Sequence, residues 1–311
     1  MTTYAAGVAH VSVPATSANL GPGFDSLGLA LDLRDHLEGR VLAAGKTSRV
    51  EIDGQGARTL PRDGSHLVVA TMRRGFEAMG CAAPPVALHC RNVVPHARGL
   101  GSSSAAIVGA LGLARALVVD GEDRLDDLAL LDLAATIEGH PDNVAPALLG
   151  GLVVAGRDDE VGVAVTPGSW WAVPAPVDAR VSAVALVPPG GVLTEVARGL
   201  LPAEVAHASA AADAGRAALL VAALGGRVEQ LWRGTRDHLH QEHRRPAMPQ
   251  TLELVDALRA DGTAALVSGA GPTVLALVVG EARAQDVLAR TPAGWASHHL
   301  RVAGDGLVVH R

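Results

Sequence analysis

The chain has 311 residues and a formal net charge of −6, from 26 basic and 32 acidic side chains, and its length predicts about two domains with a substantial core. The acidic balance and an aromatic content of 2% exclude a typical nucleic-acid-binding surface, which needs basic residues and stacking side chains. Lys46 is the single lysine and lies outside any glycine-rich segment, which disfavours Walker-A, protein-kinase and pyridoxal enzymes because each needs a lysine at its site.

Hydrophobic periodicity predicts strands and helices in both halves of the chain. The expected strands are 9–13, 28–33 (or a short apolar turn there), 41–52, 86–90, 152–165, 181–187, 264–268, 273–279 and 306–310. The expected helices are 66–79, 102–119, 125–138, 144–151, 194–200, 213–224, 251–261 and 282–290. The stretch 166–178 has three prolines and is expected to be a crossing segment. This mixture predicts an α+β or α/β enzyme with a boundary near Val165.

The cysteines and the hydropathy pattern indicate where in the cell the protein is expected. Cys81 and Cys90 are isolated and have no CxxC partner, which excludes a disulfide framework or a cysteine zinc site and fits a reducing cytoplasm. No basic-then-apolar signal peptide is present at the N-terminus. The longest uncharged run, 262–280, has glycine and proline in its middle, so it predicts strand–turn–strand rather than a membrane span. We therefore expect no membrane partner.

A loop rich in glycine and serine, 95–104, runs into the helix expected over 102–119. Gly99 and Gly101 allow positive φ and a close approach of the backbone to a ligand. The three serines that follow place hydroxyl and free amide groups at a helix N-terminus, and that geometry binds phosphate without a lysine. By itself the segment fits a flexible turn with a helix cap equally well.

Two other segments are dense in turn residues. In 14–25, Asn19 and Asp25 add an amide and a carboxylate to a rigid Gly/Pro frame, and a carboxylate there suits a substrate ammonium group. An ordinary loop is the alternative. The segment 267–273 predicts a strand, a glycine turn and a second strand, with an even chance of ligand contact.

The segment 138–146 follows a predicted helix. Glu138 ends that helix, where the negative end of the helix dipole disfavours a carboxylate and favours a cation partner such as Mg²⁺. A solvated terminal glutamate is the alternative. Asp142 and Asn143 also suit an ordinary turn. His140 is interpreted as structural, because no second histidine lies at metal-ligand spacing.

Four segments in chain order resemble those of the GHMP kinases, which phosphorylate small alcohols with ATP: PATSANLGPGFD, GLGSSSAA, EGHPDNVAPA and SGAGPT. The first and third are similar to those of homoserine kinases in particular. The resemblance implies an α+β fold in which a ribosomal-protein-S5-like, ATP-binding domain (1–165) meets a ferredoxin-like domain (166–311), with the site between them. It also implies phosphorylation of L-homoserine with ATP and Mg²⁺, a step of threonine biosynthesis, by a cytoplasmic homodimer.

The same resemblance implies residue roles. The expected ATP-binding residues are Pro95, Arg98, Gly99, Leu100, Gly101, Ser102, Ser103 and Ser104. Ser103 and Glu138 would hold Mg²⁺. Asn19 and Asp25 would meet the substrate ammonium group, and Asn143 would orient the hydroxyl as the catalytic residue. Asp142 ranks as structural first and as a catalytic base second, because phosphoryl transfer has a loose transition state and does not require a strong base.

Homoserine is a small zwitterion, and arginine is the best clamp for its carboxylate because the planar fork makes paired charge-assisted bonds. The segment around Arg198 resembles a Thr-x-x-Ala-Arg motif of the family, and Thr194 would support the carboxylate. In a later segment the family arginine lies five residues before a proline, which selects Arg244 over Arg245. The alternative is that these arginines are solvated surface residues.

Two other functions compete with homoserine phosphorylation. The first is another GHMP kinase that acts on mevalonate, a sugar or a related alcohol, which would not need two arginines. The second is a non-catalytic relative that keeps the fold as a binding module. The intact glycines, serine loop and Glu138 argue against that second alternative.

Overall fold

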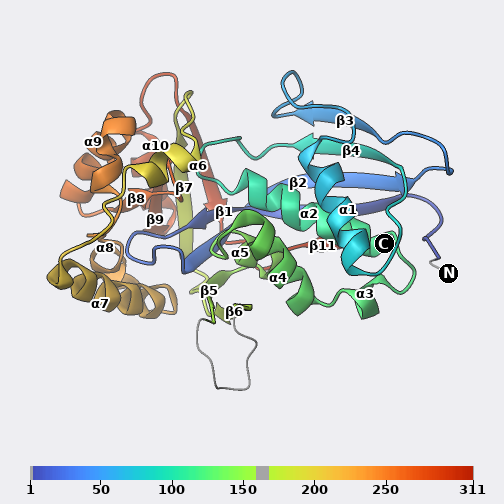
Figure 1. Ribbon diagram of the computed structural model, residues 1–311. Helices are drawn as coiled ribbons and strands as arrows, with labels where there is room; N and C mark the ends of the chain where they lie inside the picture. The colour runs from blue at the N-terminus through green and yellow to red at the C-terminus, as the bar shows by residue number, and fades with distance from the viewer. Residues whose placement is uncertain (1–2, 159–167, 311) are drawn as a thin grey trace.

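The computed structural model describes residues 3–158 and 168–310, which form two β-sheets with helices on their faces (Figure 1). The first sheet has the order β11-β1-β2-β4-β3, with β5 paired to β2 and β6 paired to β5. Its strands are β1 (Ala9–Ala18), β2 (Leu27–Val41), β3 (Arg49–Gly54), β4 (Val86–Asn92), β5 (Leu152–Arg157), β6 (Trp170–Ala175) and β11 (Val308–His310). All pairs are antiparallel except β3 with β4.

Helices cover one face of this seven-stranded sheet (Figure 1). They are α1 (Leu67–Ala78), α2 (Ser102–Ala116), the short α3 (Gly121–Arg124), α4 (Asp127–Glu138) and α5 (Val144–Leu149). The central helix α2 is rich in alanine and glycine, so it packs close to the strands: a Cβ on Gly109 would lie 2.6 Å from the side chain of Leu37 and 3.1 Å from that of Val13. This close packing fixes the N-terminus of α2 at the end of β1.

The second sheet is antiparallel with the order β10-β7-β9-β8. Its strands are β7 (Val181–Val187), β8 (Ala264–Val267), β9 (Val274–Val279) and β10 (Ala296–Arg301). Its helices are α6 (Thr194–Gly199), α7 (His207–Leu224), α8 (Leu231–Gly234), α9 (Pro249–Ala260) and α10 (Glu281–Leu288). Strand β7 is buried on both faces: Val184 packs with α9 and α10, whereas Ala185 joins a core that includes Leu29 of β2. One apolar core therefore joins the two sheets.

The α+β class is confirmed, two local predictions are wrong, and one strand was missed. The strand predicted over 41–52 divides: β2 ends at Val41, the chain turns at Gly45, where φ is +82°, and β3 begins at Arg49. The crossing segment predicted over 166–178 contains β6, whose one proline, Pro174, is tolerated because β6 is an edge strand. Strand β10 was not predicted, since only Leu300 of its six residues is buried and no apolar alternation marks it.

The predicted boundary between 165 and 166 lies outside the described residues, as does the end of the strand predicted over 152–165. Two strands that follow this boundary, β6 and β11, belong to the first sheet. Among the described residues, no helix combines the length and apolar character needed to cross a membrane.

Candidate active site

A cleft of about 230 Å³ opens where six separate segments meet: the loop after β1, the N-terminus of α2, the connection between α4 and α5, helix α6, a 3₁₀ helix (Glu242–Ala247), and the turn between β8 and β9. Twelve residues predicted from the sequence line it: Asn19, Arg98, Gly99, Gly101, Ser102, Ser103, Glu138, Asp142, Asn143, Thr194, Arg198 and Arg244. The fold thus brings together lining residues that are up to 252 positions apart in the chain, Ala18 and Ala270.

The loop before α2 requires its two glycines for close packing as well as for conformation. Gly99 has a φ of +74°, and a Cβ there would lie 2.2 Å from the carbonyl oxygen of Ser268. Gly101 is the N-cap of α2 with a φ of +68°, and its Cβ would lie 1.9 Å from Thr16 Oγ1. No side chain caps α2. The first-turn amides and the positive end of the helix dipole therefore face the cleft, where they favour an anion.

A hydroxyl and carboxylate cluster lies beside this helix N-terminus. Ser103 donates a hydrogen bond to Glu138 Oε1 at 2.6 Å, and Ser104 donates to the same oxygen at 2.9 Å. Glu138 is the last residue of α4, so its carboxylate is stabilised by the two hydroxyls and not by its own helix. Ser103 and Glu138 both line the cleft, and these hard oxygen donors are the ligand type that Mg²⁺ prefers.

Four residues of the predicted ATP loop are placed differently from the others. Leu100 is 1% exposed in the core between the sheets, Ser104 is fully buried, and neither they nor Pro95 line the cleft. Arg98 lines the cleft, but its guanidinium donates to the carbonyl oxygens of His96, Pro188 and Pro189. These bonds attach the loop to the end of β7, so the side chain of Arg98 holds the loop in place.

The loop after β1 has a compact, left-handed backbone. Asn19 and Asp25 both have positive φ, +66° and +54°. Asn19 is 4% exposed; its Oδ1 accepts the backbone N–H of Asp25 at 2.9 Å, and its Nδ2 donates to Gly269 O at 3.0 Å. Asn19 therefore joins the β1–β2 loop to the β8–β9 turn, across the two sheets.

Asp25 and Arg198 form a bidentate ion pair, with Nη–Oδ distances of 2.5 and 3.0 Å. The hydrogen bonds to Asp25 raise the pKa of the Arg198 guanidinium, which is already fully charged at neutral pH. The guanidinium also lies over the ring of Phe24, 5.4 Å from its centroid. The two groups predicted to bind opposite charges of the substrate thus lie side by side and hold each other in position.

Arg244 and Arg245 occupy opposite environments. Arg244 lies in a 3₁₀ helix (Glu242–Ala247), is 1% exposed and lines the cleft. Its hydrogen bonds run from Nη1 to Gly269 O and His240 Nδ1, and within the described residues its buried Nε has no hydrogen-bond partner. Burial lowers its pKa to about 10, so it stays cationic at neutral pH. Arg245 instead forms surface ion pairs with Glu242 and Asp256.

Asp142 and Asn143 lie at the start of α5. The Asp142 carboxylate is 2% exposed and lies 2.8 Å from His140 Nδ1. Burial opposes the charged form of His140, but the hydrogen bond and charge of Asp142 outweigh it and raise the pKa of the imidazole. Asn143 Oδ1 accepts a hydrogen bond from the Thr16 hydroxyl at 2.7 Å, which directs the Asn143 amide group toward the cleft.

Three residues that shape the cleft were not identified from the sequence. Thr16 and Phe24 lie within the segment 14–25, where the surrounding turn residues give neither of them a distinctive pattern. His240 is buried, and burial lowers its pKa, so its neutral ring accepts from Arg244 at Nδ1 and donates from Nε2 to Gly21 O at 2.7 Å. No local pattern marks His240, because the residues around it have neither helical nor strand periodicity.

The family model described as "GHMP kinases N terminal domain" matches residues 66–151, and "GHMP kinases C terminal" matches residues 216–296. Both halves of the chain thus carry the signature of the GHMP kinases, enzymes that use ATP, typically with magnesium.

Homoserine kinase of Streptomyces avermitilis is 49% identical over 98% of this chain and 97% of its own. That of Corynebacterium diphtheriae is 45% identical over 86% and 85%. The crystal structure of homoserine kinase from Cytophaga hutchinsonii matches with a TM-score of 0.83 at 28% identity, over 97% of each chain. The chain belongs to the homoserine kinase family, which confirms the predicted resemblance.

A more distant structure shares the fold alone. Mevalonate diphosphate decarboxylase from Staphylococcus aureus is 14% identical with a TM-score of 0.65, over 98% of each chain. The same α+β framework therefore occurs with other chemistry, and the side chains of the cleft must decide the substrate.

Proposed function

We propose that this chain transfers the γ-phosphoryl group of ATP to the side-chain hydroxyl of L-homoserine, giving O-phospho-L-homoserine and ADP. The observation that carries the proposal is the charge pattern of the cleft. A buried, cationic Arg244, whose Nε has no hydrogen-bond partner in the part of the chain that the structure describes, lies in the same cleft as Arg198, which is paired with Asp25. These charges complement a small zwitterionic amino acid, and an apolar or sugar substrate would leave the buried Arg244 without a counter-charge.

Nucleotide binding uses the α2 N-terminus. The backbone of 99–104 presents amide groups to the phosphates, which replaces the lysine of other ATP sites. Ser103 and Glu138 are the residues that hold Mg²⁺, because their oxygens already converge within 2.6 Å and both line the cleft. The bound ion supplies charge neutralisation at the phosphates.

Substrate binding uses both sheets. The Nε and Nη2 side of the Arg244 fork receives the homoserine carboxylate, supported by Arg198 and by Thr194 at the start of α6. Asp25 and Asn19 receive the ammonium group. Asn19 is hydrogen-bonded to the β8–β9 turn, and its side chain accepts a hydrogen bond from the backbone of Asp25, so the proposed ammonium site lies where the two sheets meet.

Asn143 orients the hydroxyl through its amide group, since Thr16 fixes the other end of that side chain. The hydroxyl oxygen forms its bond to the γ-phosphorus as the bond to ADP breaks, and its proton passes to a phosphoryl oxygen. The Asp142 carboxylate is hydrogen-bonded to His140 and has a structural role. Positioning and electrostatics supply most of the rate, as expected for a loose transition state.

A coupled ADP-release assay with Mg²⁺, ATP and either homoserine, mevalonate or galactose tests the proposal. We expect turnover with homoserine and none with the other two alcohols. Turnover with mevalonate or galactose would replace the proposed substrate by another alcohol. Failure to bind ATP, with no turnover on any of the three, would favour a non-catalytic binding module.

A further inference from the structure

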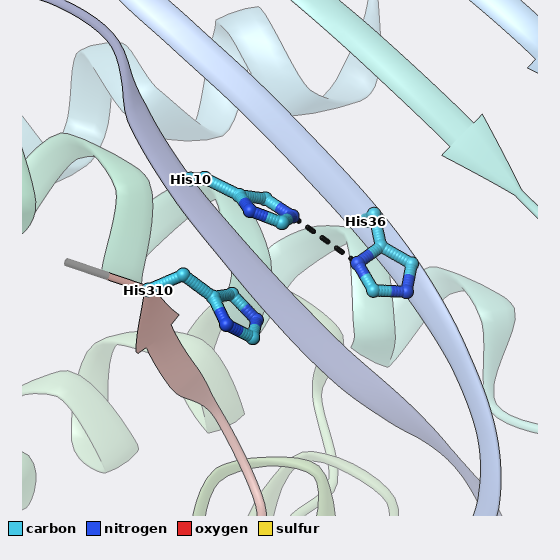
Figure 2. A group of neighbouring side chains, drawn as sticks. All are labelled: His10, His36 and His310. Carbon is cyan, nitrogen blue, oxygen red and sulfur yellow. Dashed lines mark hydrogen bonds between the residues drawn. The ribbon is translucent and has the colours of Figure 1, made fainter.

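Three histidines cluster on the face of the seven-stranded sheet that the helices leave open. His10 lies on β1, His36 on β2 and His310 on β11 (Figure 2). In the strand register His10 is opposite His310, and His36 is opposite Ser12, two residues along β1. Val11 and Leu37 pack under the helices, so the alternating residues face the other way. None of the three histidines lines the active-site cleft.

The spacing of the ring nitrogens suits a metal ion. One nitrogen from each ring lies within 4.8 Å of the other two, and His10 Nε2 is 3.1 Å from His36 Nδ1 (Figure 2). Tetrahedral Zn²⁺ with bonds of about 2.0–2.1 Å separates its ligand nitrogens by about 3.3 Å. The His310 ring is stacked on His10 at 4.3 Å between ring centroids and is exposed, so it has room to adjust toward a bound ion.

The protonation state of the cluster also suits a metal, since imidazole binds as the neutral base. Burial, followed by the other histidines, lowers the pKa of both His10 and His36. The charged groups nearby are Glu38, which opposes this shift at His10, and Arg91 and Arg34, which contribute to it. His10 and His36 are therefore neutral at pH 7.

A second layer of hydrogen bonds supports His310. The Ser12 hydroxyl lies 2.9 Å from His310 Nε2 and accepts a hydrogen bond from Arg34 Nε at 3.2 Å. Arg34 also donates to the carbonyl oxygens of Asp305 and Gly306, which precede β11. Because Nε2 of His310 is hydrogen-bonded to Ser12, Nδ1 is the nitrogen that can bind a metal ion. Metal-bound histidines commonly have one ring nitrogen on the metal and the other hydrogen-bonded to the protein.

We propose that His10, His36 and His310 form a binding site for a divalent cation that prefers imidazole, Zn²⁺ first, with water completing the coordination. The site is distinct from the Mg²⁺ position in the cleft, because Mg²⁺ prefers oxygen ligands. A bound ion would link β11, which is only three residues long, to β1 and β2.

The test is a Zn²⁺ titration of the chelator-treated full chain by calorimetry, with excess Mg²⁺ to occupy the oxygen site. We expect one Zn²⁺ per chain. The variant His10→Gln/His36→Gln/His310→Gln should bind at least about tenfold more weakly, since loss of even an outer partner costs about 10–100-fold in metal affinity. Co²⁺ should give visible absorption bands with the wild type and not with the variant.

The matched control is His298→Gln on β10, a histidine outside the cluster. It should bind Zn²⁺ like the wild type. Zn²⁺ should also raise the Tm of the wild type and slow amide exchange in β11, while the Tm of the triple variant does not respond. Equal Zn²⁺ affinity and stoichiometry in the wild type and the triple variant would overturn the proposal, as would the absence of Zn²⁺ binding by the wild type.

Discussion

Replacement of Arg244 by methionine tests the proposed carboxylate clamp. Methionine has a similar length and no charge, so it limits the cavity left by the buried guanidinium, which is 1% exposed. Both hydrogen bonds of Arg244 to the protein use Nη1, and within the described residues Nε has no partner. The Nε and Nη2 groups can therefore make two charge-assisted bonds to one carboxylate.

The expected size of the effect follows from these two bonds. Each hydrogen bond to a charged group contributes about 1.5–3 kcal/mol, so the loss of both costs at least about 3 kcal/mol. At 1.36 kcal/mol per factor of ten, kcat/KM for homoserine should fall at least about 100-fold. Most of the change should be a rise in KM, since carboxylate binding is the same in the ground and transition states.

The assay is ADP release with saturating MgATP, run on homoserine and on 3-aminopropan-1-ol, the analogue that lacks the carboxylate. The matched control is Arg245→Met, which removes a surface arginine paired with Glu242 and Asp256 and should leave both rates unchanged. An Arg244→Met enzyme that is folded and keeps its homoserine KM would refute the reasoning. So would an equal loss on both substrates.

Four further predictions follow from the cleft and its neighbours. Glu138→Gln should raise the Mg²⁺ concentration for half-maximal rate at least about tenfold, measured by Mg²⁺ titration of turnover; no change would contradict its role. Asp142→Asn should keep near-normal kcat with no new pH dependence, whereas a loss above about 100-fold would identify a base. Because the pKa of His140 is raised, its ion pair should stabilise the fold fully below about pH 6.5 and lose that effect as the pH rises through the raised pKa. The Tm difference between the wild type and His140→Gln should therefore shrink as the pH rises. A difference that grows with pH would contradict this. Gly101→Ala should lower both Tm and activity, because the added Cβ would lie 1.9 Å from a side-chain oxygen. The control Gly190→Ala should change neither, because no atom of the described residues lies within 4 Å of the added Cβ.

The secondary structure shows where local patterns are sufficient. The helix predicted over 66–79 is α1, because apolar residues at helical spacing are followed by Gly80 with its φ of +68°. The strand predicted over 41–52 is wrong because β2 ends where its neighbours end, and apolar alternation alone cannot place that point. Strand β6 was missed because the prolines of 166–178 argue against a strand, whereas Pro174 is compatible with an edge strand that pairs with β5.

The sequence by itself determined the family and the kinds of side chain in the cleft, since the glycines, the serines and Glu138 occur in short motifs that can be recognised without the structure. Tertiary structure alone decided how those groups pair. Asp25 and Arg198 are 173 residues apart and meet in one ion pair, and Thr16 orients Asn143 from 127 residues away. Burial separates Arg244 from its neighbour Arg245, although both are arginines in one 3₁₀ helix. Such contacts depend on how the two sheets pack together, and the hydrophobic periodicity of single elements does not show which distant polar side chains meet.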